Sequence, residues 1–534
     1  MQYLLPILLC IPLIGAIGGA MLPRWARGKR WGILISFATA FTGAVLAYNF
    51  DWKTGGMQFV YDGPGIEAIG FKISLGVDGI SLLLVLMTCF LHPLAVTSSF
   101  RSIRVRTREH YAWFNLLLLT MLGVFVSRDL LLFYFFFELS LVPLFFIVSI
   151  WGGHDRRAAA AKLFIYTFAG GVLTLTAIIY LGTRAGTFDM SAAIAFAQTS
   201  LTSGERFWVL IGLLCGLGVK TPLVPFHTWL PLAHTEAPTA GSVDLAALVL
   251  KLGTYGLIRI ALPVGIIGPN GELRNVEVYH VLAMLCVIGV IFGALAAWVQ
   301  TDIKKLVAYS SVSHLGFCVL GMLALNDIGM QGSVYYMVNH GINTGALFLC
   351  IGMIYNRFHT RDINELSGLG RAMPKLAFFM VFFVMASVGL PGTNGFVSEF
   401  LCILGAFTND SLRIYAIIAS IGIVLGAVYL LHMTAKVIFG PLRYPVLHGE
   451  MDTHETIHPK YVPGADITGR EVAVLTPLAM AVLLLGIFPT PFLKSMEQPL
   501  RDIQNSATVA TMNHVPAVAL VEAGFPRRDT KEHE

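Results

Sequence analysis

Four charged side chains lie inside apolar stretches of this sequence, where charge is costly. Glu138 lies among leucines and phenylalanines, nine residues past Asp129 and so about 13 Å further along a helix. Lys251 lies in the middle of the apolar segment 239–262, too far from either end to reach a polar boundary easily. Lys220 and Glu399 complete the set. An ionised side chain at the centre of a membrane helix costs on the order of 3 kcal/mol, so these residues need a reason to be there.

Carboxylates and amines in apolar surroundings can hold and release protons. Burial disfavours the ammonium form of a lysine, whereas a carboxylate about 4–6 Å away favours it. A change in the separation of Glu138 and Lys220 would therefore switch the lysine between binding and releasing a proton. One such charge is explained equally well by a structural ion pair. Two lysines and two glutamates on four separate segments favour a proton pathway.

Histidines add relay candidates, because imidazole titrates near neutral pH and can pass a proton through either nitrogen. His227 and His234 flank the end of one apolar segment, and His314 and His340 lie in two others. A single histidine of this kind is better explained as a hydrogen-bonding link between helices. As a set interspersed with serine and threonine, these residues can line a wet channel. Haem ligation by two of them is the weaker alternative, because nothing fixes a pair.

The elements that carry these residues must lie mostly in lipid. Of 534 residues, 56% are hydrophobic and 13% charged, whereas a soluble chain carries about 25% charged residues. Apolar runs of around 20 residues recur, each long enough to cross a hydrocarbon layer of about 30 Å as a helix. We therefore predict an all-α polytopic membrane protein with about fourteen transmembrane helices. The predicted spans are 3–22, 31–49, 76–98, 110–127, 129–151, 160–182, 207–231, 239–262, 277–299, 303–323, 332–356, 375–408, 413–439 and 472–493.

Lysine and arginine concentrate in alternate loops between the predicted spans. The basic loops are 24–30, 101–108, 156–162, 304–305, 357–375 and 443–470. The positive-inside rule puts these loops in the cytoplasm and both termini on the periplasmic side of a bacterial inner membrane. The first run, 3–22, has its basic cluster after it rather than before it, which is the reverse of a secretory signal. It is expected to remain as the first span.

Two spans are predicted to be broken inside the membrane. Pro222 and Pro225 interrupt one apolar run, and Pro391 with three nearby glycines interrupts another. Irregular backbone at that depth is tolerated only where protein covers it or where it lines a wet cavity. Two broken spans about 170 residues apart point to repeats of inverted topology, as in transporters.

Other chemistry has little support. The seven cysteines all lie in apolar runs and none forms a C-x-x-C pair, so neither disulfides, nor an iron–sulfur cluster, nor a zinc site is expected. No phosphate-binding glycine motif, Walker loop or nucleophile elbow is present. The basic residues are scattered over short loops, which argues against nucleic-acid binding.

The stretch VKTPLVPFHTWLPLAHTEAPTAGS at 219–242 resembles the antiporter-like membrane subunits of respiratory complex I and their relatives in multisubunit cation/proton antiporters. The resemblance continues through TDIKKLVAYSSVSH at 301–314, HTRD at 359–362 and LPGT at 390–393, and it covers most of residues 76 to 493. Within this family the chain is most similar to the M-type subunits of bacterial NADH:quinone oxidoreductase. Glu399 is the discriminating residue, because sibling subunits generally carry lysine there.

The resemblance implies a role for each buried charge. Glu138 would tune Lys220, Lys251 would be the central relay, and Glu399 would be the terminal site. His314 and His340 would lie on a hydrated axis, with His227 as a further relay candidate. Protons would move along these residues while NADH is oxidised and quinone reduced in other subunits.

No cofactor is then expected in this chain, and NADH, FMN, iron–sulfur clusters and quinone would belong to partner subunits. The expected partners are neighbouring antiporter-like subunits and the lipid bilayer. Two alternatives stay open: a subunit of a cation/proton antiporter without a redox partner, and a scaffold whose charges only lock subunits together.

The chain is expected to divide into five parts. They are N-terminal spans at 1–109, a first five-helix antiporter-like repeat at 110–262, a second, inverted five-helix repeat at 277–439, a cytoplasmic loop and last span at 440–493, and a polar C-terminal tail at 494–534.

Overall fold

The computed structural model describes residues 1–21, 28–443 and 465–504, and most of these residues are helical. The N-terminal elements are α1 (Leu4–Met21), α2 (Gly28–Asn49), β1 (Gln58–Ile66), the short 3-10 helix η1 (Glu67–Ile69), β2 (Phe71–Val77) and α3 (Gly79–Ser98). The middle elements are α4 (Thr107–Val126), α5 (Leu130–Leu139), α6 (Leu141–Trp151), α7 (Arg156–Ala185), α8 (Met190–Thr199), α9 (Ser203–Lys220), the 3-10 helix η2 (Phe226–Trp229), α10 (Leu230–Glu236), α11 (Thr239–Asp244), η3 (Leu245–Val249), α12 (Leu250–Gly256) and η4 (Leu257–Ile266). The remaining elements are α13 (Val276–Trp298), α14 (Ile303–Leu323), α15 (Asp327–Phe358), α16 (Leu369–Ala372), α17 (Pro374–Val388), α18 (Asn394–Thr408), α19 (Arg413–Ile438), α20 (Gly469–Ile487) and α21 (Thr490–Gln504).

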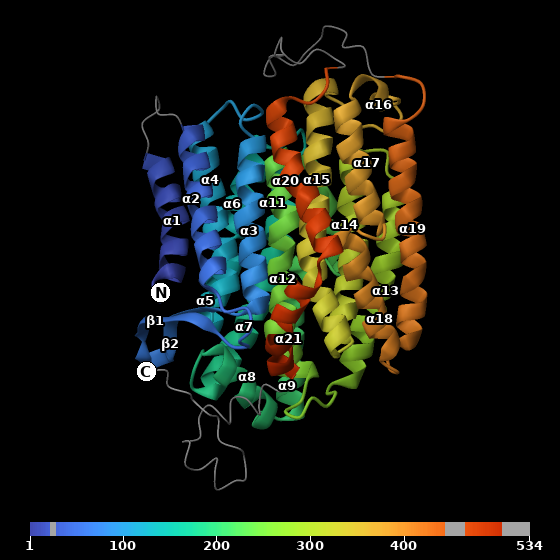
Figure 1. Ribbon diagram of the computed structural model, residues 1–534. Helices are drawn as coiled ribbons and strands as arrows, with labels where there is room; N and C mark the ends of the chain where they lie inside the picture. The colour runs from blue at the N-terminus through green and yellow to red at the C-terminus, as the bar shows by residue number, and fades with distance from the viewer. Residues whose placement is uncertain (22–27, 444–464, 505–534) are drawn as a thin grey trace.

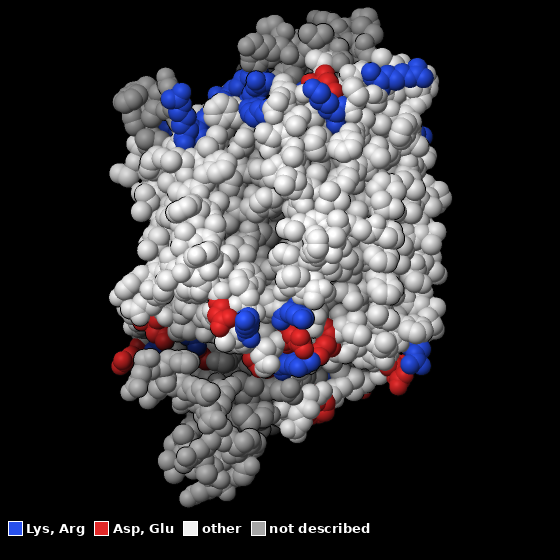
Figure 2. Space-filling view, viewed as in Figure 1, with Lys and Arg blue, Asp and Glu red and all other residues white. Residues whose placement is uncertain are grey.

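The long helices stand side by side in one upright bundle (Figure 1). Twelve of the described helical segments are long and apolar enough to cross a membrane, and the shorter apolar helices α17 and α18 follow each other in the chain. The polytopic all-α prediction is confirmed, whereas the count of about fourteen stays a prediction. Figure 2 shows Lys, Arg, Asp and Glu confined to two rims, with a broad band free of them between. Such a band matches a lipid-facing surface.

The two rims differ in sign. The upper rim in Figure 2 is mainly Lys and Arg, whereas the lower rim mixes both signs. Helix α1 begins and α21 ends on the lower side, where the β1–β2 hairpin lies (Figure 1). Both ends of the described chain therefore lie on the side opposite the mainly basic rim. The periplasmic placement of the termini stays a prediction. We call the upper rim the basic-loop side and the lower rim the hairpin side.

Both predicted breaks are present. Helix α9 ends at Lys220, and five residues separate it from η2 and α10, with a cis peptide bond at Val224–Pro225. Helix α17 ends at Val388 and α18 begins at Asn394, with Gly389 and Gly392 at positive φ between them. Helix α17 starts on the basic-loop side, whereas α9 starts on the hairpin side (Figure 1). The two broken spans thus run in opposite directions, in keeping with inverted repeats.

The structure also contains elements that hydropathy did not predict. The antiparallel hairpin β1–β2 and the short helix α8 lie on the hairpin side (Figure 1). The boundary placed at residue 493 is wrong, because residues 494–504 belong to α21. Helix α21 buries Met496, Leu500 and Ile503 against α3 and α15. Polar residues between these buried positions made the amphipathic helix look like a polar tail. Residues 505–534 of the predicted tail lie outside the described part.

The centre of the bundle is formed by two spans that face neither lipid nor water. Every residue of the most apolar 18-residue window is buried both in the span Thr239–Ile266 and in α15. Helix α14 is nearly as enclosed. Polar side chains on these spans are therefore enclosed by protein, and three of the predicted site residues, Lys251, His314 and His340, lie on them.

Candidate proton-transfer site

Lys220 is the last residue of α9 and is almost completely buried. Its Nζ donates a hydrogen bond to Ser140 Oγ at 2.8 Å and to the Phe137 carbonyl at 3.0 Å. It also lies 4.4 Å from the centre of the Phe137 ring, within cation–π range. The break after Lys220 lets the side chain reach the joint between α5 and α6, where Ser140 interrupts the two helices.

Glu138 lies between these two partners in the chain, but the two charges do not bond directly. Neither carboxylate oxygen of Glu138 has a hydrogen-bond partner among the described residues. The carboxylate still lies close enough to Lys220 to interact electrostatically. An unpaired buried carboxylate is costly when it is ionised, so the predicted interplay of Glu138 and Lys220 stays a prediction.

Helix α7 makes room for this carboxylate with a glycine. A Cβ added at Gly171 would lie 2.3 Å from Glu138 Oε2 and 2.8 Å from its Cδ. Any larger residue there would displace the side chain. The position of Glu138 thus depends on a close approach of α5 to α7.

Lys251 lies on α12 between the two π-helical segments η3 and η4. Its side chain is fully buried, and its Nζ donates to the Ala246 carbonyl at 2.6 Å. π-helical turns widen a helix and recur at functional sites. The second partner of Lys251 is His340 Nδ1 on α15, at 2.7 Å.

The line continues from His340 to His314 on α14. The two imidazole rings are 5.8 Å apart between centroids. His314 Nδ1 is hydrogen-bonded to the Tyr336 hydroxyl at 2.6 Å, and the Tyr429 hydroxyl lies 3.4 Å from its Nε2. His340 Nε2 has no partner within the described part of the chain. His340 can therefore exchange a proton with an added water through Nε2, whereas His314 is hydrogen-bonded at both ring nitrogens.

A small cavity joins this histidine pair to Glu399 in the second broken span. It has a volume of about 20 Å³, and it is lined by His314, Tyr336, Asn339, His340, Asn343, Thr344, Ser387, Gly395 and Glu399. A space of this size with polar walls suits one water molecule. Glu399 is 6% exposed. Lys251, His340, His314 and Glu399 thus form one continuous polar line from α12 to α18, which we call the central line.

Three of the predicted residues, Glu138, Lys220 and His227, lie off the central line. Lys220 does not contact Lys251, although α9 and α12 pack closely: a Cβ added at Gly253 would lie 2.5 Å from Thr221 Oγ1. That hydroxyl has no partner among the residues the structure describes. His227 lies against Phe292, with ring centroids 5.1 Å apart, and belongs to a separate region.

Sequence reasoning missed several polar partners in the core. Ser140, Tyr336 and Tyr429 were not singled out, because neutral hydroxyls are common in apolar helices. His92 and Asp244 form a fully buried pair at 2.8 Å. Asp244 could have been found from the sequence, since it is a charge within a predicted span.

This arrangement defines a class of protein: a multi-pass membrane protein whose core carries enclosed carboxylates, amines and imidazoles along an internal line. Within the described residues, no cluster of His, Cys, Asp and Glu is arranged to hold a metal ion. The groups present can bind and pass protons.

Comparisons with known proteins agree with this class. A family model described as NADH:quinone oxidoreductase/Mrp antiporter, TM matches residues 127–437, and one described as NADH-ubiquinone oxidoreductase chain 4, amino terminus matches residues 29–127. The chain therefore belongs to the family of membrane subunits shared by NADH:quinone oxidoreductases and Mrp antiporters. The resemblance based on 219–242 and 301–314 is confirmed.

Individual relatives cover nearly the whole chain. The NADH-quinone oxidoreductase subunit M of Rhodobacter capsulatus is 40% identical over 506 residues, which is 92% of this chain and 94% of that protein. The NADH-ubiquinone oxidoreductase chain 4 of Marchantia polymorpha is 35% identical over 496 residues, again 92% and 94%.

Solved structures share the fold. A chain of respiratory complex I from Thermus thermophilus superposes with a TM-score of 0.80 at 28% identity, covering 94% of this chain and 99% of that one. A chain of the Mrp complex from Dietzia sp. gives 0.81 at 20% identity, covering 94% and 98%. The second likeness shows the fold alone.

Proposed function

We propose that this chain is the M-type, proton-translocating membrane subunit of a respiratory NADH:quinone oxidoreductase. The observation that carries the proposal is the central line, in which Lys251 bonds His340, and His314 and Glu399 share one small polar cavity. The relatives named as subunit M support the choice of complex. NADH, FMN, iron–sulfur clusters and quinone would then belong to partner subunits, and this chain would add proton transfer only.

Glu138 and Lys220 act as the switch in this proposal. In the structure Lys220 is held by the neutral acceptors Ser140 and Phe137, while the Glu138 carboxylate is free of hydrogen bonds. A movement of α5 driven by a neighbouring subunit would bring the carboxylate to the ammonium and favour its charged form. Movement back would release the proton towards Thr221, whose free hydroxyl faces α12.

From Lys251 the proton passes to His340, then to His314 and through a water to Glu399. At each step an N–H or O–H bond breaks on the donor as one forms on the acceptor, and one positive charge moves with the proton. Each acceptor must have released its previous proton first. The chain would sit in a bacterial inner membrane with the basic loops in the cytoplasm and both termini on the periplasmic side.

Charge removal at the switch tests the proposal. In the purified complex reconstituted in lipid vesicles, Glu138→Ala or Lys220→Ala should depress proton pumping and coupled quinone reduction while the complex still assembles. Because acid–base groups contribute about 10²–10⁴-fold to a rate, we expect a loss of at least about tenfold. Normal pumping in both variants would defeat the proposal.

The alternative is a cation/proton antiporter subunit without a redox partner. The matching family model includes Mrp antiporters, and a chain of an Mrp complex has the same fold. Membranes lacking this chain would then lose sodium tolerance but keep NADH oxidation, whereas the proposed function predicts the reverse. A purely structural scaffold predicts that the two substitutions abolish assembly, which a native gel would reveal.

A further inference from the structure

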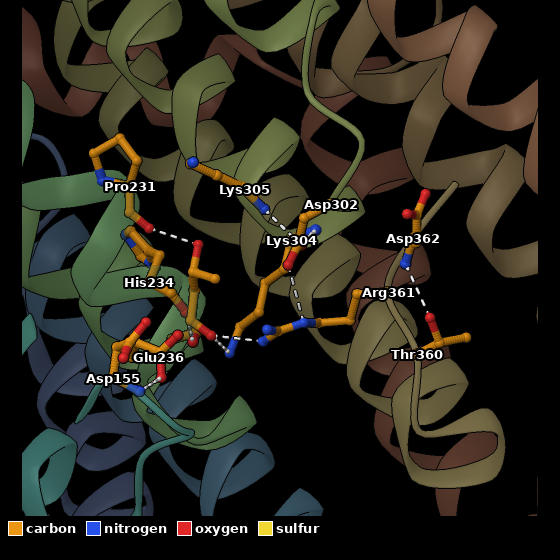
Figure 3. Close-up of polar contacts among 12 residues, drawn as sticks. Asp155, Pro231, His234, Glu236, Asp302, Lys304, Lys305, Thr360, Arg361 and Asp362 are labelled. Carbon is orange, nitrogen blue, oxygen red and sulfur yellow. Dashed lines mark hydrogen bonds and ion pairs between the residues drawn. The ribbon is translucent and has the colours of Figure 1, made fainter. Parts of the chain in front are cut away.

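A second group of buried ionisable side chains lies between the central line and the basic-loop side. It consists of His234 and Glu236 on α10 and Lys304 on α14. Figure 3 shows Lys304 reaching from α14 to the end of α10, beside Glu236 and His234, with Arg361 approaching from the other side. The switch and the central line use none of these residues.

Exposure falls steadily from the loop surface towards the centre along this group. His154 and Asp155, in the loop before α7, have side chains that are 98% and 67% exposed. Glu236 is 9% exposed, Lys304 6% and His234 0%. The backbone N–H of Asp155 donates to Glu236 Oε2 at 2.9 Å, so the glutamate directly touches the exposed loop. The group therefore leads inward from solvent.

His234 is the innermost member and faces two lysines. Both of its ring nitrogens lack hydrogen-bond partners among the described residues, although the ring is fully buried. The ring is stacked on Phe348, with centroids 4.9 Å apart, which fixes its plane. Lys304 and Lys251 both lie close enough to interact with it electrostatically. An imidazole so placed can accept a proton through one nitrogen and release it from the other.

Lys304 connects this histidine to Glu236. Its Nζ donates to the Ala237 carbonyl and, at 3.4 Å, to that of Thr235, and it interacts electrostatically with Glu236. A cation at the carboxyl end of a helix also stabilises the helix dipole, so a purely structural clamp is the competing explanation. Arg361 already serves that purpose, because its Nη1 donates to the Thr235 carbonyl at 2.6 Å. A clamp also leaves the free nitrogens of His234 and the burial of Glu236 unexplained.

We propose that Glu236, Lys304 and His234 form a proton intake relay from the basic-loop side to Lys251 and His340. The inference rests on the proposed function. A proton from water forms an O–H bond on the Glu236 carboxylate, moves to the neutral amine of Lys304, and then to a ring nitrogen of His234. Each bond that forms is matched by one that breaks, and bridging waters or small side-chain rotations close the gaps.

The test uses the intact complex in lipid vesicles, with proton uptake and the H₂O/D₂O rate ratio measured during NADH oxidation. Glu236→Gln and His234→Leu should each slow coupled turnover and proton uptake by about tenfold or more. They should also raise the isotope ratio above that of the parent, because proton intake becomes rate-limiting. Lys305→Met is the matched control: it removes the same charge from the neighbouring position and should behave like the parent.

Lys304→Arg separates the relay from a clamp. Arginine keeps the charge and the hydrogen bonds to the α10 carbonyls but does not give up its proton. Loss of uptake in this variant supports the relay, provided that a native gel shows normal assembly. Full activity of Lys304→Arg, or parent-like uptake and isotope ratios in Glu236→Gln and His234→Leu, would overturn the inference.

The same measurements distinguish this inference from the proposed function. If Glu138→Ala abolishes pumping while Glu236→Gln and His234→Leu pump normally, only the intake relay is wrong. If Glu138→Ala and Lys220→Ala pump normally, the proposed function is wrong, and the inference loses the function on which it rests.

Discussion

At the scale of single residues, the core depends on which acceptor each buried charge finds. Lys220 is held by Ser140 Oγ and the Phe137 carbonyl rather than by Glu138, at distances of 2.8 and 3.0 Å. A hydrogen bond to a charged group is worth about 1.5–3 kcal/mol. This free energy is small enough for a movement of α5 to exchange the hydrogen-bond partner of Lys220. It is large enough to keep Lys220 with one partner at a time.

The glycine beside Glu138 provides a test at this scale. Gly171→Ala would place a Cβ 2.3 Å from the carboxylate oxygen, so the side chain must shift away. We expect the proton-pumping rate to fall in the reconstituted complex, because the carboxylate no longer approaches Lys220 correctly. Gly426→Ala is the matched control, since a Cβ at that helical position meets nothing within 4 Å. Equal pumping by the two variants would show that the position of Glu138 does not matter.

At the scale of elements, breaks and π-helical turns place the polar groups. The break after α9 leaves Lys220 at a helix end, and the break before α18 brings Glu399 to the cavity shared with His314. The π-helical turns on both sides of α12 orient Lys251 towards Ala246 and His340. Interrupted helices thus expose backbone and side chains only where other protein segments enclose them.

The pairing of α15 with α20 predicts a large stability effect. Arg357 makes a two-point ion pair with Glu471, at 3.1 and 2.8 Å, and both residues are nearly fully buried. Arg357→Met leaves the glutamate buried without its partner, which costs about 3–5 kcal/mol. The thermal unfolding midpoint of the detergent-solubilised complex should fall clearly.

Two comparisons make this prediction specific. Arg413→Met breaks the exposed pair with Asp410 and should cost no more than about 1 kcal/mol. The double variant Arg357→Met with Glu471→Met should recover part of the lost stability, because no charge is then left unpaired. A midpoint for Arg357→Met no lower than that of Arg413→Met would contradict the argument.

At the scale of the whole molecule, α21 connects α3 with α15 on the hairpin side. Ser495 packs so closely on Gly79 of α3 that an added Cβ there would lie 1.9 Å from the Ser495 carbonyl oxygen. At the other end Arg501 forms an ion pair with Asp327 at the start of α15, at 2.9 Å, and Gln504 donates to the Leu325 carbonyl. The amphipathic helix therefore acts as a strap between α3 and α15.

Truncation tests the strap. A chain that ends after Ile487 loses the buried side chains of Met496, Leu500 and Ile503, each worth about 1.5–3 kcal/mol of burial. We expect less assembled complex on a native gel and a lower thermal midpoint. A chain that ends after Gln504 keeps every described contact of α21 and is the control. Equal assembly of the two truncated chains would refute a bridging role for the helix.

Hydropathy and charge pattern determined the class of this protein from sequence. Long apolar runs, basic alternate loops and prolines within spans are local features, so the membrane helices, both breaks and the four buried charges were predictable. The hairpin β1–β2 and α21 were not, because a search for long apolar runs passes over short segments that are polar on average. The roles expected of these residues came from the family resemblance, which no local pattern contains, and they stay predictions.

Only the tertiary structure decided which charges meet. Lys251 and His340 are 89 residues apart in sequence, yet their nitrogens are 2.7 Å apart. Lys220 is hydrogen-bonded to Ser140 and Phe137, and the expected tuning of Lys220 by Glu138 stays a prediction. Apolar surface acts over whole segments and is insensitive to small shifts, whereas a hydrogen bond needs atoms placed within a few tenths of an ångström. That placement is set by the packing of helices far apart in the chain.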